Sequence, residues 1–321
     1  MSGVTGFDAA AGGWVAARIT KAATWELDFI ASPNDTKITQ GEVYVPSMLV
    51  EYVTRNKLSL IDMPVGLVGA GQLTNGQLSP QLAMHRESAA RRLLRERVVN
   101  GGRYVASVFS TPVQEAVYAE RYEAASKLNM DALGKAISKQ TWNLVYRIKQ
   151  VQAVIRMVPG SIGTLLEAHP ETVFRLLHAN SDVCTDRLTS KRTQQGIDQR
   201  LRLLDASLPG AQAVFEEAWE DWGKGARVQR DDVVDAMVLA LCAFCGLQDG
   251  KLLTPDVRDG SLREVELTLV DFAASKLGSG IHSRRRDVLA KAQIPEGVPR
   301  GAGDVPLCMV YCDPGCFKAS R

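Results

Sequence analysis

The order of its first five structured segments constrains the fold of this 321-residue chain more than any other feature. Three short apolar stretches, at 4–10, 14–19 and 25–30, are separated by tight turns, which is typical of a meander of three strands. A helix that begins at Pro46 and a nearly continuous apolar run over 58–62 follow. A right-handed crossover through that helix would lay the fourth strand parallel to the first and beside it.

Two of the predicted strands carry an aspartate near their ends. Asp8 lies in the first strand and Asp62 comes at the end of the fourth. If the strands are parallel neighbours, both carboxylates project from the same edge of the sheet. Either aspartate alone could be an ordinary turn-capping residue. Two buried carboxylates side by side, however, are costly unless a cation neutralises them.

A further pair of aspartates opens the apolar segment 231–247, which is predicted to be a long helix packed on the sheet. Asp232 and Asp235 are three positions apart, so they share one face of that helix. Negative charge also suits a helix N-terminus, and Asp231 is interpreted in this way or as a supporting residue. Together with the two strand aspartates, the pair would form a set of oxygen ligands of the kind that Mg²⁺ or Mn²⁺ prefers.

The middle of the chain, about 69–160, is predicted to be a mainly helical insertion. Its predicted elements are a loop over 69–80 and helices over 83–98, 112–128 and 138–155. After it we expect a strand over 162–168 and helices over 171–179 and 193–206. Residues 1–248 are therefore predicted to form one α/β domain, and 249–321 a C-terminal extension or tail of unknown role. In that extension 249–263 is loop-like, and 264–277 fits either a helix or a strand.

Two further site candidates lie at the end of the predicted strand over 162–168 and directly after it. Glu167 could supply another ligand or orient one, and His169 could accept a proton from water or bind a phosphate. A turn-capping role for His169 before Pro170 is an equally good explanation. Candidate contacts to a nucleic-acid backbone come from the insertion: Arg91, Arg92, Arg95, Lys139 and Gln140. A solvated helix face is the ordinary explanation of such a basic cluster.

Composition sets only wide limits. Hydrophobic residues make up 45% of the chain and the net charge is +2, so a core is available and nucleic acid is neither required nor excluded. No apolar run approaches the ~18 residues of a membrane span, and no secretory signal is visible, so a cytoplasmic location is expected. Cys242 and Cys245 are predicted to pack in the core of a helix. The tail residues Cys308, Cys312 and Cys316 lack a fourth zinc ligand nearby.

Several motifs together resemble those of domain-of-unknown-function family 429. They span about 3–247 and comprise Asp8 with Gly12-Gly13-Trp14, IDMPVGL, Arg86-Glu87, SVFSTPV, SKQTWNL, EAHPE and DDVVDA. The resemblance implies an RNase H-like mixed sheet flanked by helices, and the family is described as predicted nucleases. More distantly, the four aspartates resemble the acids of Holliday-junction resolvases of the RuvC type. Asp62 departs from that pattern, because those resolvases carry a glutamate there.

These expectations favour a metal-dependent nuclease that hydrolyses phosphodiester bonds with two Mg²⁺ or Mn²⁺ ions. One ion would activate water and the other would stabilise the leaving oxygen. The expected partner is DNA or RNA and not a membrane, and a homodimer is left open. One alternative is a non-catalytic nucleic-acid-binding or regulatory module on the same fold. A less favoured one is an actin-like ATPase, because the chain has only Gly12-Gly13 and no paired phosphate loops.

Overall fold

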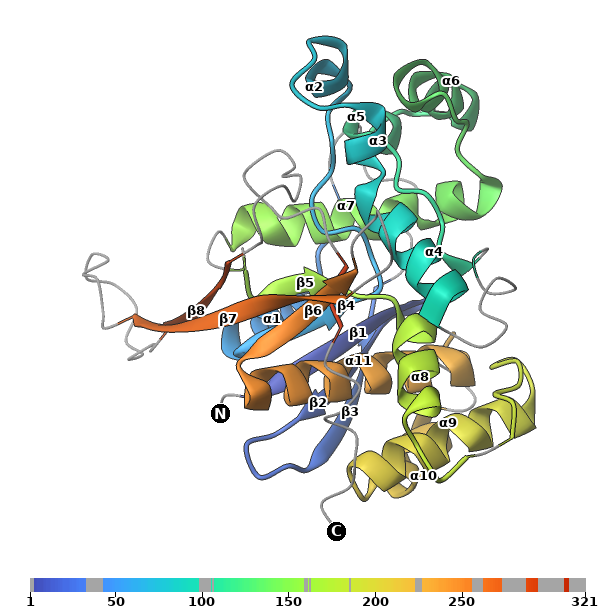
Figure 1. Cartoon of the computed structure of the whole chain (residues 1–321), viewed down its shortest axis with the longest axis vertical. Coiled ribbons are helices and arrows are strands. Elements are labelled where there is room, and N and C mark those ends of the chain that lie inside the picture. The colour runs from blue at the N-terminus through green and yellow to red at the C-terminus, as the bar shows by residue number, and fades with distance from the viewer. Residues whose placement is uncertain are drawn as a thin grey trace.

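The main sheet has five strands in the order β3-β2-β1-β4-β5 (Figure 1). The computed structural model describes residues 3–32, 43–97, 105, 107–158, 161, 163–184, 186–222, 227–255, 262–272, 287–293 and 309–311. The strands of this sheet are β1 (Val4–Ala10), β2 (Gly13–Ile19), β3 (Trp25–Ala31), β4 (Leu58–Ile61) and β5 (Leu165–Glu167). The first three are antiparallel, and β4 runs parallel to both β1 and β5. The predicted mixed α/β sheet, with the fourth strand beside the first, is confirmed.

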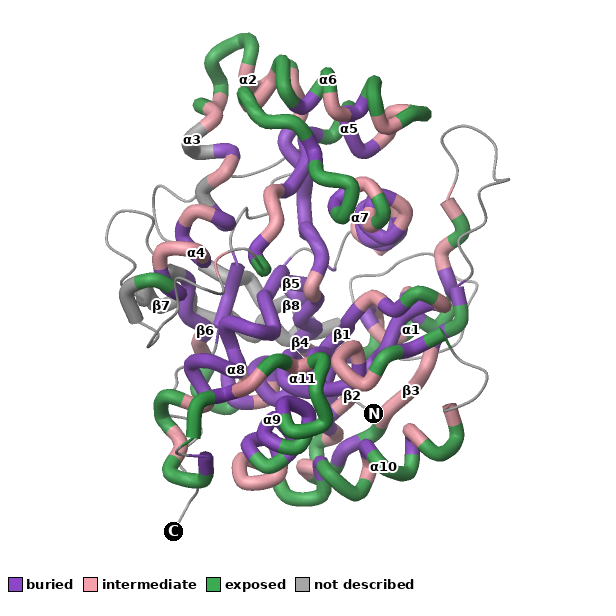
Figure 2. Tube along the Cα trace, turned by 90° about the vertical axis from the view of Figure 1, so that its right-hand side faces the viewer, coloured by how far each residue is buried: buried purple, intermediate pink, exposed green. Residues whose placement is uncertain are grey.

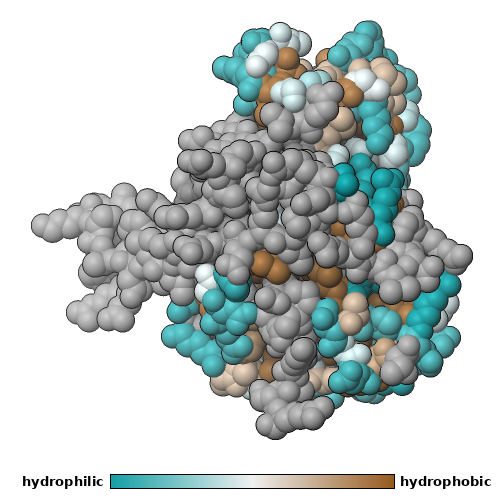
Figure 3. Space-filling model, viewed as in Figure 1, coloured by the Kyte–Doolittle hydropathy of each residue, from teal (hydrophilic) through white to brown (hydrophobic). Residues whose placement is uncertain are grey.

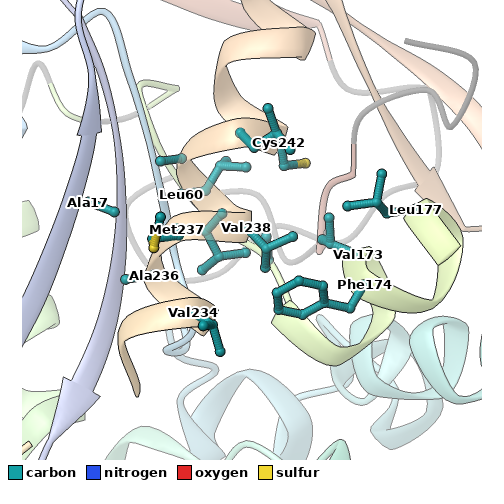
Figure 4. Packing of buried hydrophobic residues seen from close by; sticks show 14 of the residues in the cluster. Ala17, Leu60, Val173, Phe174, Leu177, Val234, Ala236, Met237, Val238 and Cys242 are labelled. Atoms are coloured by element: carbon teal, nitrogen blue, oxygen red, sulfur yellow. The ribbon is translucent and has the colours of Figure 1, made fainter. Parts of the chain in front are cut away.

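Helix α11 (Arg230–Asp249) lies directly on β1, because Gly6 places no side chain between them. A Cβ atom at Gly6 would lie 2.1 Å from the carbonyl oxygen of Ala236 and 2.3 Å from the amide nitrogen of Ala240. The helix contributes small side chains at this contact, and both alanines are fully buried. Figure 4 shows this face of α11, with Ala236 and Met237 toward the strands and Val238 toward Phe174. The close approach brings the first turns of α11 to the edge where β1 ends.

Helices cover both faces of the sheet, and each face has its own core. On one face α11 packs with α8 (Pro170–Ala179), α9 (Gln194–Ser207) and α10 (Ala211–Trp222) around buried side chains such as Leu60 and Phe174. On the other, α1 (Ser47–Arg55) and α7 (Lys139–Met157) pack on Phe7 and Trp14. Strands β1, β2, β4 and β5 are almost wholly buried, whereas the edge strand β3 is mostly half-buried or exposed (Figure 2). Helix α10 was not predicted from the sequence.

The insertion forms one end of the molecule, beyond the edge at which β1, β4 and β5 end (Figure 1). Its helices are α2 (Ala70–Thr74), α3 (Pro80–Ala83), α4 (His85–Arg97), α5 (Gln114–Val117) and α6 (Tyr122–Leu133), followed by α7. The predicted loop over 69–80 is therefore wrong where α2 forms. The outer surface of this end is largely hydrophilic, with a few exposed apolar side chains between (Figure 3).

The single helix predicted over 112–128 is also wrong, because the segment folds back on itself as α5 and α6. Ala116 and Ala125 belong to one small core together with Val113 and Ile137. In a continuous helix these two alanines would be separated by roughly 13 Å along the axis at 1.5 Å per residue. The break after α5 lets both bury against the same neighbours, so tertiary packing overrides the helical pattern.

The C-terminal part contains a three-stranded antiparallel sheet of β6 (Lys251–Pro255), β7 (Leu262–Phe272) and β8 (Asp287–Gln293). The prediction that 249–263 is loop-like is wrong where β6 forms, and 264–277 is a strand as far as Phe272. The last described residues, Met309–Tyr311, lie beside β5, where the amide of Val310 donates to the carbonyl of Glu167 at 2.9 Å.

Leu252 and Tyr311 are fully buried in the same core as α11. Parts of the predicted C-terminal extension or tail therefore pack on the main domain.

The cysteines of α11 behave as predicted, since Cys242 and Cys245 are buried in the core and form no disulfide within the described residues. The tail residues Cys308, Cys312 and Cys316 fall outside the described residues. Among the helices that the structure describes, none is long and apolar enough to cross a membrane.

Candidate functional site

Asp8 and Asp62 lie side by side at one edge of the main sheet. Phe7 is paired with Ile61 across β1 and β4, and the amide of Asp62 continues this ladder by donating to the carbonyl of Phe7 at 3.1 Å. Side chains alternate along a strand, so Asp8 points to the same face as Gly6, toward α11. The two strand aspartates therefore meet the helix at the point where it approaches the sheet most closely.

The first turns of α11 add Asp232 and Asp235 to this edge. Asp235 is 1% exposed and Asp8 is 8% exposed, so both carboxylates are removed from water. Burial raises the pKa of Asp8 well above its usual value, and the charges of Asp235, Asp62 and Asp232 raise it further. The structure thus brings all four predicted aspartates into one cluster, which we call the acid cluster: Asp8, Asp62, Asp232 and Asp235.

Every member of the acid cluster holds its proton more tightly than an exposed aspartate. Burial raises the pKa of Asp62 to about 6, against the opposing effect of the Lys191 charge. Burial also raises the pKa of Asp232 to about 7, although the amide of Gln229 favours the ionised form. Asp8 and Asp235 are buried, and Asp62 and Asp232 are half-buried. Four carboxylates gathered in this way need more positive charge than the site provides, so the arrangement favours the capture of a cation.

Asp232 has a second role at the start of α11. One of its carboxylate oxygens accepts a hydrogen bond of 2.8 Å from the amide of Gln229, which precedes the helix. This is the helix-capping role that the sequence also allowed for acids at this position. Asp232 is therefore partly committed to the helix, whereas no hydrogen bond to the carboxylate of Asp8 or Asp62 is found among the described residues.

Lys191 contacts the acid cluster, and this residue was not predicted from the sequence. Its ammonium donates a hydrogen bond to Oδ2 of Asp235 and lies 4.0 Å from Oδ2 of Asp231. Burial lowers the pKa of Lys191, but the charges of Asp235 and Asp8 outweigh it and raise the pKa above the ordinary value. The lysine precedes α9, whose N-cap residue is Thr193. The loop that carries Lys191 reaches the edge of the sheet through tertiary packing, which no local sequence pattern indicates.

The donor set of the acid cluster fits a divalent cation in its chemistry. All four side chains offer carboxylate oxygens, which suit Mg²⁺ or Mn²⁺. Oδ1 of Asp235 is buried and has no hydrogen-bond partner, as expected of an atom that should face a cation or water. In the described part of the chain, however, no three Asp, Glu, His or Cys side chains already surround one point as metal ligands. The ammonium of Lys191 supplies positive charge at this place instead.

Glu167 lies next to the acid cluster but is engaged elsewhere. Its Oε2 accepts hydrogen bonds from Nη1 of Arg86 at 2.6 Å and from the amide of Val65 at 3.2 Å. Arg86 is buried and also donates to the carbonyls of Val65 and Gly66. The structure therefore uses Glu167 to hold the turn that follows Asp62. Glu167 therefore has the orienting role that was one of its two predicted roles. No contact of Glu167 among the described residues supports the other, which is that of a further metal ligand.

His169 serves as the N-cap of α8. Its Nδ1 accepts from the amide of Thr172 at 3.3 Å, and its Nε2 lies 3.2 Å from the carbonyl oxygen of Ser107. A carbonyl only accepts, so Nε2 carries the hydrogen and the lone pair of Nδ1 faces the helix. Burial lowers the pKa of His169, which keeps the ring neutral. With both nitrogens engaged, the capping explanation describes this residue better than proton transfer.

A small pocket borders the acid cluster on the side of Asp62. It is lined by polar groups of Asp62, Thr111, Glu167 and His169 and by apolar side chains of Met63, Pro64, Val108, Phe109 and Met309. The pocket thus joins the edge of the main sheet, the insertion and the C-terminal segment.

The five predicted backbone-binding residues lie on α4 and α7 of the insertion, and their contacts to nucleic acid stay a prediction. Arg91 donates to the carbonyl of Val108 and the hydroxyl of Ser110, so it holds this loop. The ammonium of Lys139 lies 3.3 Å from the ring centre of Tyr122. Gln140 and Arg95 are exposed and Arg92 is half-buried. Within the described residues, no hydrogen bond or ion pair joins Arg91, Arg95, Lys139 or Gln140 to the acid cluster.

Comparison with known proteins identifies a family but no named relative. No curated protein and no solved structure matches the chain significantly. A family model described as "Protein of unknown function (DUF429)" matches residues 6–259, which include most of β1, all of β2 to β5, the insertion and all four members of the acid cluster. This match covers most of the chain and agrees with the motifs named above: the chain belongs to the DUF429 family.

Proposed function

We propose that this protein is a divalent-metal-dependent nuclease whose acid cluster forms the catalytic centre. The observation that carries the proposal is the convergence of four aspartates from β1, β4 and α11 at one buried edge, with Oδ1 of Asp235 left without a partner. Such a set of carboxylates is expensive to bury and has no structural use that requires four of them. Perturbed pKa values gathered at one place also favour a functional site.

Within this proposal the chain's own residues have distinct roles. Asp8, Asp62 and Asp235 would hold the metal, and Asp232 would support them while it caps α11. Arg86 and Glu167 fix the turn that carries Asp62. A bound Mg²⁺ or Mn²⁺ would supply Lewis-acid activation of water and neutralise charge on a phosphodiester. The buried side chains on both faces of the sheet keep the acids in place before substrate arrives.

The proposed substrate is nucleic acid. A phosphodiester brings negative charge to a site that is already acidic, so it would bind only with the metal present. Basic residues exposed on the insertion, including Arg95, would contact the backbone further away. Cys184, Cys242 and Cys245 are buried and form no disulfide within the described residues, which agrees with the reducing cytoplasm, where we expect the protein to act.

A non-catalytic module is the second candidate, and one observation favours it. The Lys191–Asp235 ion pair supplies a cation from the chain itself, as expected of a site that holds no metal. Calorimetry with MnCl₂ separates the two functions, because a module of this kind would release no heat of binding and its melting temperature would not change.

The nuclease proposal is tested by cleavage of labelled single-stranded and duplex DNA and RNA with Mg²⁺, Mn²⁺ or EDTA. Replacing Asp8 or Asp235 by Asn should lower the rate by roughly 100-fold or more, since each loses charge that acts on the transition state. Asp205→Asn, in the last turn of α9 and outside the acid cluster, is the matched control and should cleave normally. Cleavage that persists in folded Asp8→Asn and Asp235→Asn variants would exclude this site.

A further inference from the structure

The ammonium of Lys191 lies where a metal bound to the acid cluster would compete with it. It donates to Oδ2 of Asp235, and its charge also acts on Asp8, Asp62 and Asp232. Asp235 is 1% exposed, and its other oxygen, Oδ1, has no partner. Lys191 therefore pairs with one of the two oxygens of Asp235, and Asp235 is one of four carboxylates in the cluster. The remaining negative charge still attracts a cation.

The backbone that carries Lys191 is fixed, whereas its side chain reaches solvent. Thr193 donates to the carbonyl of Ser190 from both its amide, at 3.1 Å, and its hydroxyl, at 2.9 Å. Gly196 packs so closely on that carbonyl that a Cβ there would lie 1.9 Å from the oxygen. The Lys191 side chain, in contrast, is 35% exposed. A rotation of its four-carbon stem can thus move the charge into water without moving the loop.

We propose that Lys191 is a built-in competitor of the divalent cation. Without metal its ammonium occupies the Asp235 side of the acid cluster and lowers the cost of burying these carboxylates. A metal that binds Asp235 must displace it, so Lys191 weakens metal affinity and is released toward solvent when the metal enters. This inference rests on the metal site of the proposed function, but it does not require that the protein cleave nucleic acid.

The test measures Mn²⁺ affinity of the full-length chain by titration calorimetry. Removing the competitor in Lys191→Met should tighten Mn²⁺ binding by about 10- to 100-fold, the range that corresponds to a hydrogen bond between charged groups. Arg192→Met is the matched control, because it removes the same charge from an exposed neighbour in the same loop. Its affinity should stay near that of the wild type, which separates direct competition from a general change in charge.

A second measurement uses the wild-type protein and does not depend on the stability of a variant. An amine-reactive reagent is applied with and without MnCl₂, and modification of each lysine is followed by mass spectrometry. Modification of Lys191 should rise several-fold with Mn²⁺, because binding moves its ammonium into solvent. Lys127, which is 76% exposed, reports on the reagent and should not change.

The outcomes separate this inference from the nuclease proposal. Unchanged or weaker Mn²⁺ binding in Lys191→Met, unchanged modification of Lys191, or no Mn²⁺ binding at all would overturn the competition. Tighter binding in a protein that cleaves no nucleic acid would support the competition and count against the nuclease. The reverse result is metal-dependent cleavage that is lost in Asp8→Asn, while Mn²⁺ affinity is the same in Lys191→Met and the wild type. That result would support the nuclease and overturn the competition.

Discussion

At the scale of single residues, Asp235 carries a buried carboxylate oxygen that lowers the stability of the fold. One of its oxygens faces Lys191 and the other has no partner, although the side chain is buried. A buried polar atom without a partner costs about 1–3 kcal/mol, more when it is charged. Such a cost persists in a folded protein where it serves a purpose. Metal capture is the purpose that best explains why four carboxylates share this edge.

Asp62 links the site to stability through pH. Burial raises the pKa of its carboxyl to about 6, compared with about 3.9 for an unfolded aspartate. The folded state therefore binds this proton more tightly, so its stabilising contribution is complete below the unfolded value and is lost as the pH rises through about 6. In EDTA, the melting temperature of the wild type should thus fall more between about pH 4.5 and about pH 7.5 than that of Asp62→Asn. An equal or larger fall in the variant would contradict this reading.

At the scale of elements, the contact between β1 and α11 depends on Gly6. A methyl group at this position would meet the backbone of Ala236 and Ala240, which cannot give way without moving the helix. Gly6→Ala should therefore lower the free energy of unfolding by about 1–3 kcal/mol through overpacking. It should also reduce metal binding, because Asp235 would move away from Asp8.

The control for Gly6→Ala is Gly71→Ala in α2, where a Cβ meets nothing within 4 Å. This change should leave stability equal or slightly higher, since alanine favours a helix. Chemical denaturation and Mn²⁺ titration of both variants decide the matter. A Gly6→Ala protein with wild-type stability and metal affinity would show that the close approach does not position the acids.

The elements that the sequence predicted best are those with strong local patterns. The apolar stretches of β1 and β2, the alternation in β3, the apolar run of β4 and the long α11 each agree with the burial of the element that forms. The predictions that were wrong concern segments whose structure is set by tertiary packing, such as the break between α5 and α6. Lys191 could not be found from sequence, because Ser190-Lys191-Arg192-Thr193 reads only as the start of a helix. Its position depends on how the α8–α9 loop returns to the sheet.

At the scale of the whole molecule, the segment Met309–Tyr311 is joined to the edge of the sheet that carries the acid cluster. Tyr311 is fully buried, its hydroxyl lies 3.6 Å from the sulfur of Met309, and the backbone between them pairs with Glu167. The sequence did not predict this contact, since β5 lies about 140 residues away along the chain.

Tyr311→Ala should lower the free energy of unfolding by about 3 kcal/mol, because it leaves a cavity in the core around α11. Tyr311→Phe keeps the ring and removes only the hydroxyl, so it should cost about 1 kcal/mol. Denaturant unfolding of the two variants separates packing from hydrogen bonding. Wild-type stability in Tyr311→Ala would show that the C-terminal segment contributes nothing to the main domain.

A crystal grown with Mn²⁺ shows whether the acid cluster holds a divalent cation. We expect an anomalous-scattering peak between Asp8, Asp62 and Asp235, with the Lys191 side chain turned away from Asp235. A structure with no peak at this edge, in which Lys191 still donates to Asp235 at saturating Mn²⁺, would contradict this expectation.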